Sequence, residues 1–255
     1  MLDGPLLLLS PHHAHRKGRH PVTTTSAAAT SAAESGSSGL QAVLLDMDGT
    51  LVDTEEFWWQ AESSLLAELG HQLDEADRAR VVGGPMTRVV DYLIDITGVA
   101  LTAAELSLMI GQRFTELLAG GVPMMPGAER LLTELSAHGV PTALVSASHR
   151  HDIDMVMRTL GNEHFAFSVA GDEVTRTKPH PDPYLVAAAR LGAEPARCVV
   201  IEDSPTGVRS AEAAGCTVIA VPTVARIEAA PGRTVLRSLE EVDLALLRRL
   251  VPARV

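Results

Sequence analysis

The chain has 255 residues, 46% of them hydrophobic and 3% aromatic, so aliphatic side chains must fill its core. Its formal net charge of −11 argues against nucleic acid, and against an anionic membrane, as the main partner. No apolar stretch approaches the roughly 18 residues that a membrane-spanning helix requires. Two cysteines outside any C-x-x-C motif favour a reducing compartment, and we expect a cytoplasmic protein.

Residues 1–39 are expected to form a disordered tail. Ala, Ser, Thr, Gly and His dominate this segment, and it shows no apolar periodicity. Four histidines between residues 12 and 20 are interpreted as part of this tail, because no acidic residue or cysteine beside them completes a metal site.

The first buried strand is expected at residues 41–46, and the motif at its end is the most informative in the chain. Residues 46–50 read Asp-Met-Asp-Gly-Thr, so Asp46 and Asp48 lie on one side of an extended backbone. Such side chains would project into the crevice at the carboxyl edge of a parallel sheet. Because adjacent carboxylates repel, the pair indicates a cation or a shared proton. An Asp-rich surface turn is the alternative, whereas an EF-hand loop is excluded because its glycine stands sixth rather than fourth.

Residues 54–124 show only helical periodicity. Four helices are expected there, at 55–69, 74–82, 86–97 and 102–119. Their position predicts a helical subdomain, residues 54–124, inserted into an α/β core of residues 40–53 and 125–255. We expect hinges at both ends and interpret the insertion as a mobile lid over a site at the sheet edge. A helical decoration that only adds stability is the alternative.

Strands and helices alternate after this insertion. Strands are expected at 141–146, 166–170, 197–202, 217–221 and, less strongly, 234–237. Helices are expected at 127–138, 150–160, 182–192, 205–214 and 239–250. This alternation predicts an α/β fold with a parallel sheet covered by helices on both faces.

Two later segments carry groups that suit a phosphate. Ser146 ends a predicted strand, and its hydroxyl, with backbone N–H groups from Ala147 onward, can hold a phosphate oxygen. Lys178 lies in a proline-rich loop, residues 175–183, which would hold one compact positive charge at a fixed point. Ordinary helix capping by the serine and an exposed lysine are the alternatives.

A third segment carries two consecutive acids, Glu202-Asp203, at the end of an apolar strand. Magnesium is held by a few carboxylates and several waters, and Asp46, the main-chain carbonyl of Asp48 and Asp203 would supply such a set. Capping of the following helix by Asp203 or Ser204 is the alternative.

In this order the four motifs resemble those of the haloacid dehalogenase superfamily, specifically phosphatase-like members with a helical cap between the first and second motifs. The resemblance covers roughly residues 40–225 and implies a Rossmann-like core, a mobile cap and magnesium as cofactor. It implies that Asp46 attacks phosphorus, forming an aspartyl-phosphate, while Asp48 acts as general acid and then as base. The residues it assigns to the phosphoryl group are Thr50, Ser146, Ala147 and Lys178. Those it assigns to the metal are Asp46, Asp48, Asp203 and, in an assisting role, Glu202.

Two positions separate this chain from hexose-phosphate mutases of that superfamily. These commonly have Val at the position of Thr50 and His at the position of Trp58, which favours a phosphatase here. From the cap, Trp58, Gly84 and Arg88 are expected to face the substrate. We expect a phosphatase of a small phosphorylated metabolite, a sugar phosphate or a nucleotide-like compound, acting as a monomer or weak homodimer. A mutase of the β-phosphoglucomutase type and a non-catalytic binding protein are the alternatives.

Overall fold

The structure is a computed structural model that describes residues 39–82, 84, 86–223 and 225–253. The described residues all belong to one unit, Gly36–Val255. The expected tail of residues 1–39 therefore lies, except for Gly39, outside the described residues.

Within the described residues, six strands form one parallel sheet in the order β3-β2-β1-β4-β5-β6. The strands are β1 (Ala42–Leu45), β2 (Thr142–Val145), β3 (Phe167–Val169), β4 (Cys198–Glu202), β5 (Thr217–Ala220) and β6 (Arg233–Val235). β1 lies in the middle, where Leu45 pairs with Leu144 of β2 on one side and with Ile201 of β4 on the other. The predicted strands and the parallel α/β core are thus confirmed.

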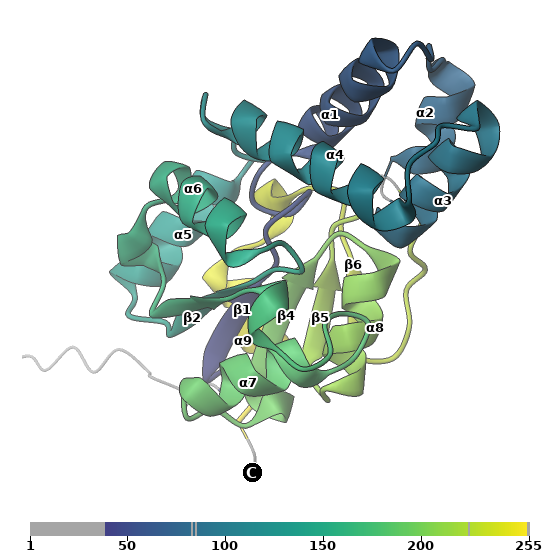
Figure 1. Cartoon of the computed structure of the whole chain (residues 1–255). Coiled ribbons are helices and arrows are strands. Elements are labelled where there is room, and N and C mark those ends of the chain that lie inside the picture. The colour runs from purple at the N-terminus through teal and green to yellow at the C-terminus, as the bar shows by residue number, and fades with distance from the viewer. Residues whose placement is uncertain (1–38, 83, 85, 224, 254–255) are drawn as a thin grey trace, which may run out of the picture. The chain divides into compact units, whose positions relative to one another are not determined.

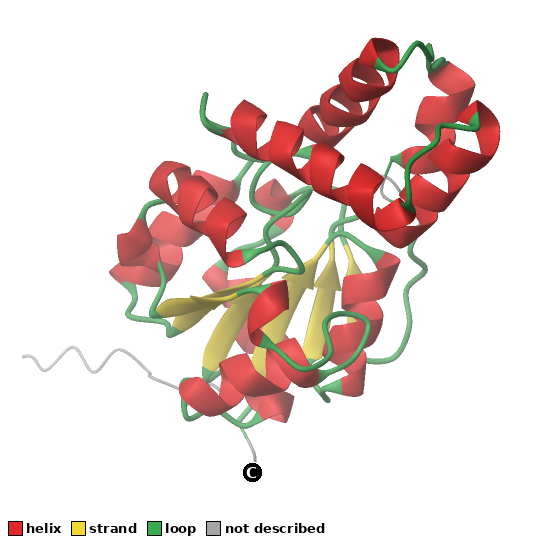
Figure 2. Cartoon of the chain, in the orientation of Figure 1, coloured by secondary structure: helices red, strands yellow, loops and turns green. Residues whose placement is uncertain are grey.

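Helices cover both faces of the sheet (Figure 2). In β1, Val43 and Leu45 belong to one buried apolar cluster, whereas Ala42 and Leu44 belong to another. The first cluster includes side chains of α5, α6 and α9, and the second includes side chains of α7 and α8. These helices are α5 (Ala128–Ala137), α6 (Arg150–Leu160), α7 (Asp182–Arg190), α8 (Pro205–Ala213) and α9 (Leu244–Leu250). Burial on both sides explains why β1 is apolar throughout.

The predicted single helix at 239–250 is wrong in its first half. A short 3₁₀ turn covers Leu239–Glu241, and α9 starts afresh at Leu244. The reason is Asp243, whose carboxylate accepts a hydrogen bond from the Leu246 N–H at 2.7 Å and so starts a new helix. The apolar spacing continues across this break, which is why periodicity alone did not reveal it.

Four helices lie between β1 and α5, and we call them the helical insertion (Figure 1). They are α1 (Glu55–Glu68), α2 (Glu75–Val81), α3 (Met86–Thr97) and α4 (Ala103–Leu118), as predicted to within two residues. α1 lies along α4, where the rings of Trp58 and Phe114 stack with centroids 3.7 Å apart. The division into a cap of residues 54–124 and a separate core stays a prediction.

No helix in the described ranges is both long enough and apolar enough to cross a lipid bilayer.

Candidate active site

The candidate site lies at the carboxyl edge of the sheet, around β1. Asp46 follows β1 directly, Ser146 follows β2, and Glu202 is the last residue of β4. Because β1 lies between β2 and β4, these three strand ends are neighbours. The connections from β1 to β2 and from β3 to β4 lead to opposite sides of β1, and such a switch point is where open α/β sheets hold ligands.

Asp46 is buried, and both of its carboxylate oxygens accept hydrogen bonds. Oδ1 accepts from Lys178 Nζ at 2.6 Å, and Oδ2 accepts from Thr50 Oγ1 at 2.8 Å. Thr50 belongs to the same motif, so the turn of residues 46–50 fixes the orientation of its own first aspartate. The structure therefore brings Asp46, Thr50 and Lys178 together.

Lys178 is the cationic centre of the site, with a side chain that is 4% exposed. Its Nζ donates to Asp46 Oδ1 at 2.6 Å, to Glu202 Oε1 at 2.7 Å and to the Val145 carbonyl oxygen at 2.9 Å. Burial alone would lower the pKa of this ammonium, but the two adjacent carboxylates outweigh that effect and raise the pKa. The lysine thus remains charged, and the interpretation of it as an exposed residue does not hold.

Asp46, Glu202 and Asp203 form a buried acidic cluster, in which one ligand oxygen from each lies within 4.8 Å of the others. Burial, followed by the charge of Glu202, raises the pKa of Asp46 to about 7 even though Lys178 opposes the shift. Burial, followed by Asp46 and Glu202, raises the pKa of Asp203 to about 9. One lysine therefore leaves part of the negative charge uncompensated. An oxygen-only set of this kind fits a hard divalent cation such as Mg²⁺.

Asp48 lies close enough to Asp46 to contribute to the raised pKa of that residue. Its Oδ1 accepts a hydrogen bond from Thr54 Oγ1 at 2.9 Å. Its Oδ2 accepts from Ser146 Oγ at 3.1 Å and from Ser148 Oγ at 2.7 Å. The Ser146 hydroxyl, expected to face a phosphate, thus holds the second aspartate here, and it also accepts from the Ser148 N–H at 2.9 Å.

Two glycines are required by the closeness of the acidic cluster. Gly49 has φ +75°, and a Cβ atom there would collide with the carboxylate of Asp203. A Cβ atom on Gly207, in the first turns of α8, would collide with the carboxylate of Glu202. Gly49 of the first motif is therefore required for two reasons: its backbone forms the turn, and its lack of a side chain leaves room for Asp203.

The sequence did not identify four residues that position the site. The Tyr184 hydroxyl donates to Glu202 Oε1 at 2.8 Å, and Thr223 Oγ1 donates to Asp203 Oδ2 at 2.6 Å. Ser148 and Thr54 hold Asp48, as described above. Ser148 carries a weak signal, since it lies two residues after Ser146, and Thr54 was expected only as a hinge. Nothing in the sequence distinguished Tyr184 from an ordinary core residue of α7.

The three residues expected to face the substrate from the cap are placed as follows. Trp58 is half-buried and has one ring face against Phe114 of α4. Gly84 lies so close to Arg88 that a Cβ atom on the glycine would collide with the guanidinium group. Arg88 itself is exposed, on the first turn of α3. Their contact with a substrate stays a prediction.

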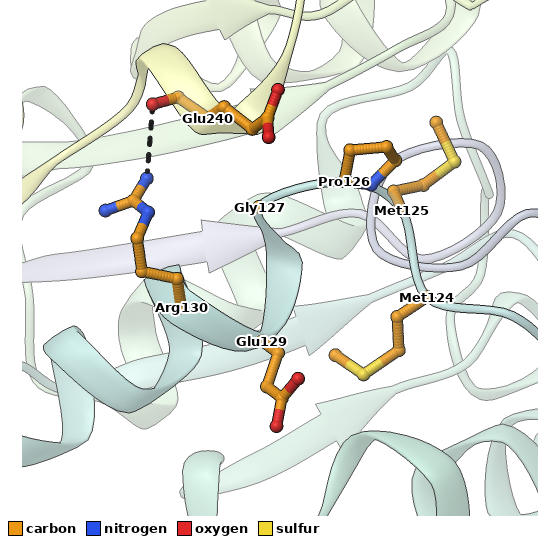
Figure 3. Close-up of a pocket in the computed structure, with 7 residues that line it drawn as sticks. All are labelled: Met124, Met125, Pro126, Gly127, Glu129, Arg130 and Glu240. Carbon is orange, nitrogen blue, oxygen red and sulfur yellow. Dashed lines mark hydrogen bonds between the residues drawn. The ribbon is translucent and has the colours of Figure 1, made fainter.

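A separate pocket of about 450 Å³ lies where the helical insertion returns to the core (Figure 3). Its lining residues are Met124, Met125, Pro126, Gly127, Glu129, Arg130 and Glu240. None of them belongs to the acidic cluster. The Arg130 guanidinium already donates to the carbonyl oxygens of Leu239 at 3.0 Å and Val242 at 2.6 Å, so we assign no ligand to this pocket.

Comparison with known proteins identifies the protein family. The family model described as haloacid dehalogenase-like hydrolase matches residues 43–221, which include the acidic cluster and Lys178. The chain belongs to this family.

Two relatives from Arabidopsis thaliana illustrate the similarity. The bifunctional riboflavin kinase/FMN phosphatase is 35% identical over 184 residues, covering 71% of this chain and 48% of the relative. (DL)-glycerol-3-phosphatase 1, mitochondrial, is 31% identical over 198 residues, covering 74% of this chain and 66% of the relative. The chain thus spans about half the length of the first and just under two thirds of the second. The crystal structure of CbbY from Rhodobacter sphaeroides in complex with phosphate is 31% identical, with a TM-score of 0.70 over 82% of this chain and 99% of that chain.

Proposed function

We propose that this protein is a magnesium-dependent phosphatase that hydrolyses a small phosphorylated metabolite through an aspartyl-phosphate on Asp46. The observation that carries the proposal is the buried Asp46, oriented by Thr50 and Lys178 beside Glu202 and Asp203. Family membership and relatives named for the hydrolysis of FMN and of glycerol-3-phosphate support it. The substrate class is a sugar phosphate or a nucleotide-like compound.

In the first step, a carboxylate oxygen of Asp46 attacks phosphorus. A new P–O bond forms to Asp46, the P–O bond to the leaving group breaks, and Asp48 gives its proton to the departing oxygen. Lys178 stays protonated and offsets part of the charge on the phosphoryl oxygens. When held by Asp46, the Asp48 main-chain carbonyl and Asp203, with Glu202 assisting, Mg²⁺ would supply the remaining positive charge.

In the second step, water hydrolyses the aspartyl-phosphate. Asp48, now ionised, takes a proton from that water as the water oxygen bonds to phosphorus, and the bond to Asp46 breaks. The hydroxyls of Thr54, Ser146 and Ser148 donate to the Asp48 carboxylate and hold it in position. Because Thr54 immediately precedes α1, its hydrogen bond connects the helical insertion directly to Asp48.

The test is hydrolysis of p-nitrophenyl phosphate by the purified chain, with Mg²⁺ and after its removal by EDTA. We expect metal-dependent phosphate release, and a loss of at least about a thousandfold in Asp46→Asn, since the nucleophile is removed. Mass spectrometry of the acid-quenched reaction should locate the phosphoryl adduct on Asp46. Asp53→Asn, an exposed aspartate beside the motif, is the matched control and should keep its activity.

Two outcomes would contradict the proposal. A parent protein without metal-dependent hydrolysis would point to a non-catalytic binding protein. Formation of a phosphate isomer in place of free phosphate, with a hexose phosphate as substrate, would point to the mutase alternative.

A further inference from the structure

Glu62, on α1 of the helical insertion, is a buried acid that the proposed mechanism does not use. It is 3% exposed. Its Oε2 is the one buried side-chain nitrogen or oxygen without a hydrogen-bond partner in the part of the chain that the structure describes. Burial, followed by the charge of Glu55, raises the pKa of Glu62 to about 8. At neutral pH this carboxyl group is therefore mainly protonated, and it can both donate and accept a hydrogen bond.

Other glutamates of the same helix have partners. Glu56 pairs with Arg78 at 2.6 Å, and Glu68 pairs with Arg113 at 2.7 Å. Leaving a buried polar atom unpaired is unfavourable, and in native proteins such atoms are few. A Leu or Met at position 62 would fill the same space among its buried neighbours without that cost. The unpaired carboxyl group is therefore poorly explained by packing and points to a ligand.

The position of Glu62 on α1 indicates where that ligand lies. Glu55, Trp58 and Glu62 are three, four and seven residues apart, so they share one face of the helix. Thr54, the residue immediately before α1, donates to Asp48 Oδ1 at 2.9 Å, so this face of the helix begins beside the candidate site. Since each helical residue advances about 1.5 Å, Glu62 lies about 10 Å further along the axis than Glu55. A phosphomonoester bound at Asp46 would extend its leaving group along this face.

We propose that Glu62 binds a hydroxyl group on the leaving group of the substrate, which selects polyol and sugar monophosphates. A hydroxyl, like a protonated carboxyl, is both donor and acceptor, so the two groups can satisfy each other. An alkyl chain at this place would leave the carboxyl group unpaired and would be disfavoured. The inference rests on the phosphatase function proposed above. FMN and glycerol-3-phosphate, for which the two relatives are named, both carry hydroxyls on the leaving group.

The test compares kcat/KM for substrates that differ in hydroxyl groups alone. Suitable pairs are glycerol 3-phosphate with propyl phosphate, and sorbitol 6-phosphate with hexyl phosphate. We expect the parent to prefer the hydroxylated member of each pair. In Glu62→Met that preference should fall at least about tenfold, because the hydrogen bond is lost. In Glu62→Gln, whose amide can still donate and accept, it should fall by a smaller factor of about three. The control is Glu68→Met on the same helix, which should keep the parent's preference.

The outcomes separate this inference from the function it rests on. If the parent hydrolyses p-nitrophenyl phosphate with Mg²⁺ but shows no preference for hydroxylated substrates, the role of Glu62 is overturned and the phosphatase stands. The same holds if Glu62→Met and Glu62→Gln both keep the parent's preference. If circular dichroism shows that Glu62→Met does not fold, Glu62→Gln decides, since a preference equal to the parent's is inconsistent with the proposal. If the parent hydrolyses no phosphomonoester, the phosphatase function itself fails.

Discussion

The edge of the sheet and the face of α1 differ in whether their carboxylates have hydrogen-bond partners. At the sheet edge, Asp46 and Glu202 share the Lys178 ammonium, and Asp48 accepts three hydroxyl hydrogen bonds. On α1, the Oε2 of Glu62 has no partner. The first arrangement pairs its carboxylates within the chain, apart from an excess of negative charge, whereas the second leaves one carboxyl oxygen unpaired. The comparison matches the two proposals, in which the core supplies the chemistry and the helical insertion supplies the choice of substrate.

The largest expected effect comes from removing the cation of the core. Lys178→Met leaves Asp46 and Glu202 buried without their shared partner, and breaking a buried ion pair in this way costs about 3–5 kcal/mol. In metal-free buffer, urea unfolding should show a loss of this size, and phosphatase activity should disappear. Arg176→Met removes an exposed arginine from the same loop, where it pairs with Asp182, and is the control. A Lys178→Met protein as stable as its parent would show that the carboxylates do not depend on the lysine.

A second effect should appear in the helical insertion as a dependence of stability on pH. The pKa of Glu62 is about 8 in the folded protein and 4.5 as its ordinary value. Between these values the folded state keeps a proton that the unfolded state has released, so the free energy of unfolding falls as pH rises from 4.5 to 8. The fall is on the order of 3 kcal/mol. Glu62→Gln lacks this titration. The free energy of unfolding of Glu62→Gln, relative to that of the parent, should therefore increase from pH 5 to pH 8.

Chemical denaturation of both proteins at several pH values measures that difference. Glu68→Gln is the matched control, because hydrogen bonding to Arg113 lowers the pKa of Glu68 and moves its titration below this window. A constant difference between Glu62→Gln and the parent would mean that Glu62 is ionised or solvated in the folded state. In that event the contrast between the two regions would disappear.

The sequence could predict which core residues lie together because the topology of the sheet determines their placement. Once β1, β2 and β4 are neighbours in a parallel sheet, residues at their ends must converge, so Asp46, Ser146 and Asp203 could be found from strand ends alone. The proline-rich loop similarly singled out Lys178.

Hydrogen-bond partners that depend on loop conformation or on helix rotation could not be found in this way. Ser146 donates to Asp48 because of how the loop after β2 turns, and nothing in the spacing of the strands fixes that. Glu62 was missed because a glutamate on an amphipathic helix is normally exposed, although positions 61, 62, 65 and 66 are all buried here. The break before α9 was missed because the spacing of apolar residues continues across Asp243 and does not reveal that this aspartate caps a new helix.

The smallest expected effect concerns Tyr184, which connects the core site to the apolar layer beneath it. The tyrosine is fully buried, and burial, followed by the charge of Glu202, raises its pKa well above the ordinary value, so its hydroxyl remains a donor. Tyr184→Phe removes one hydrogen bond to Glu202 but leaves that carboxylate paired with Lys178, so we expect a loss of about 1–2 kcal/mol in stability. Activity should fall only a few-fold. Tyr92→Phe removes the hydroxyl that donates to Asp77 within the insertion, and it should leave activity unchanged. If Tyr184→Phe matched the parent in stability and activity, Lys178 and Ser204 would suffice to hold Glu202, and the tyrosine would act only through packing.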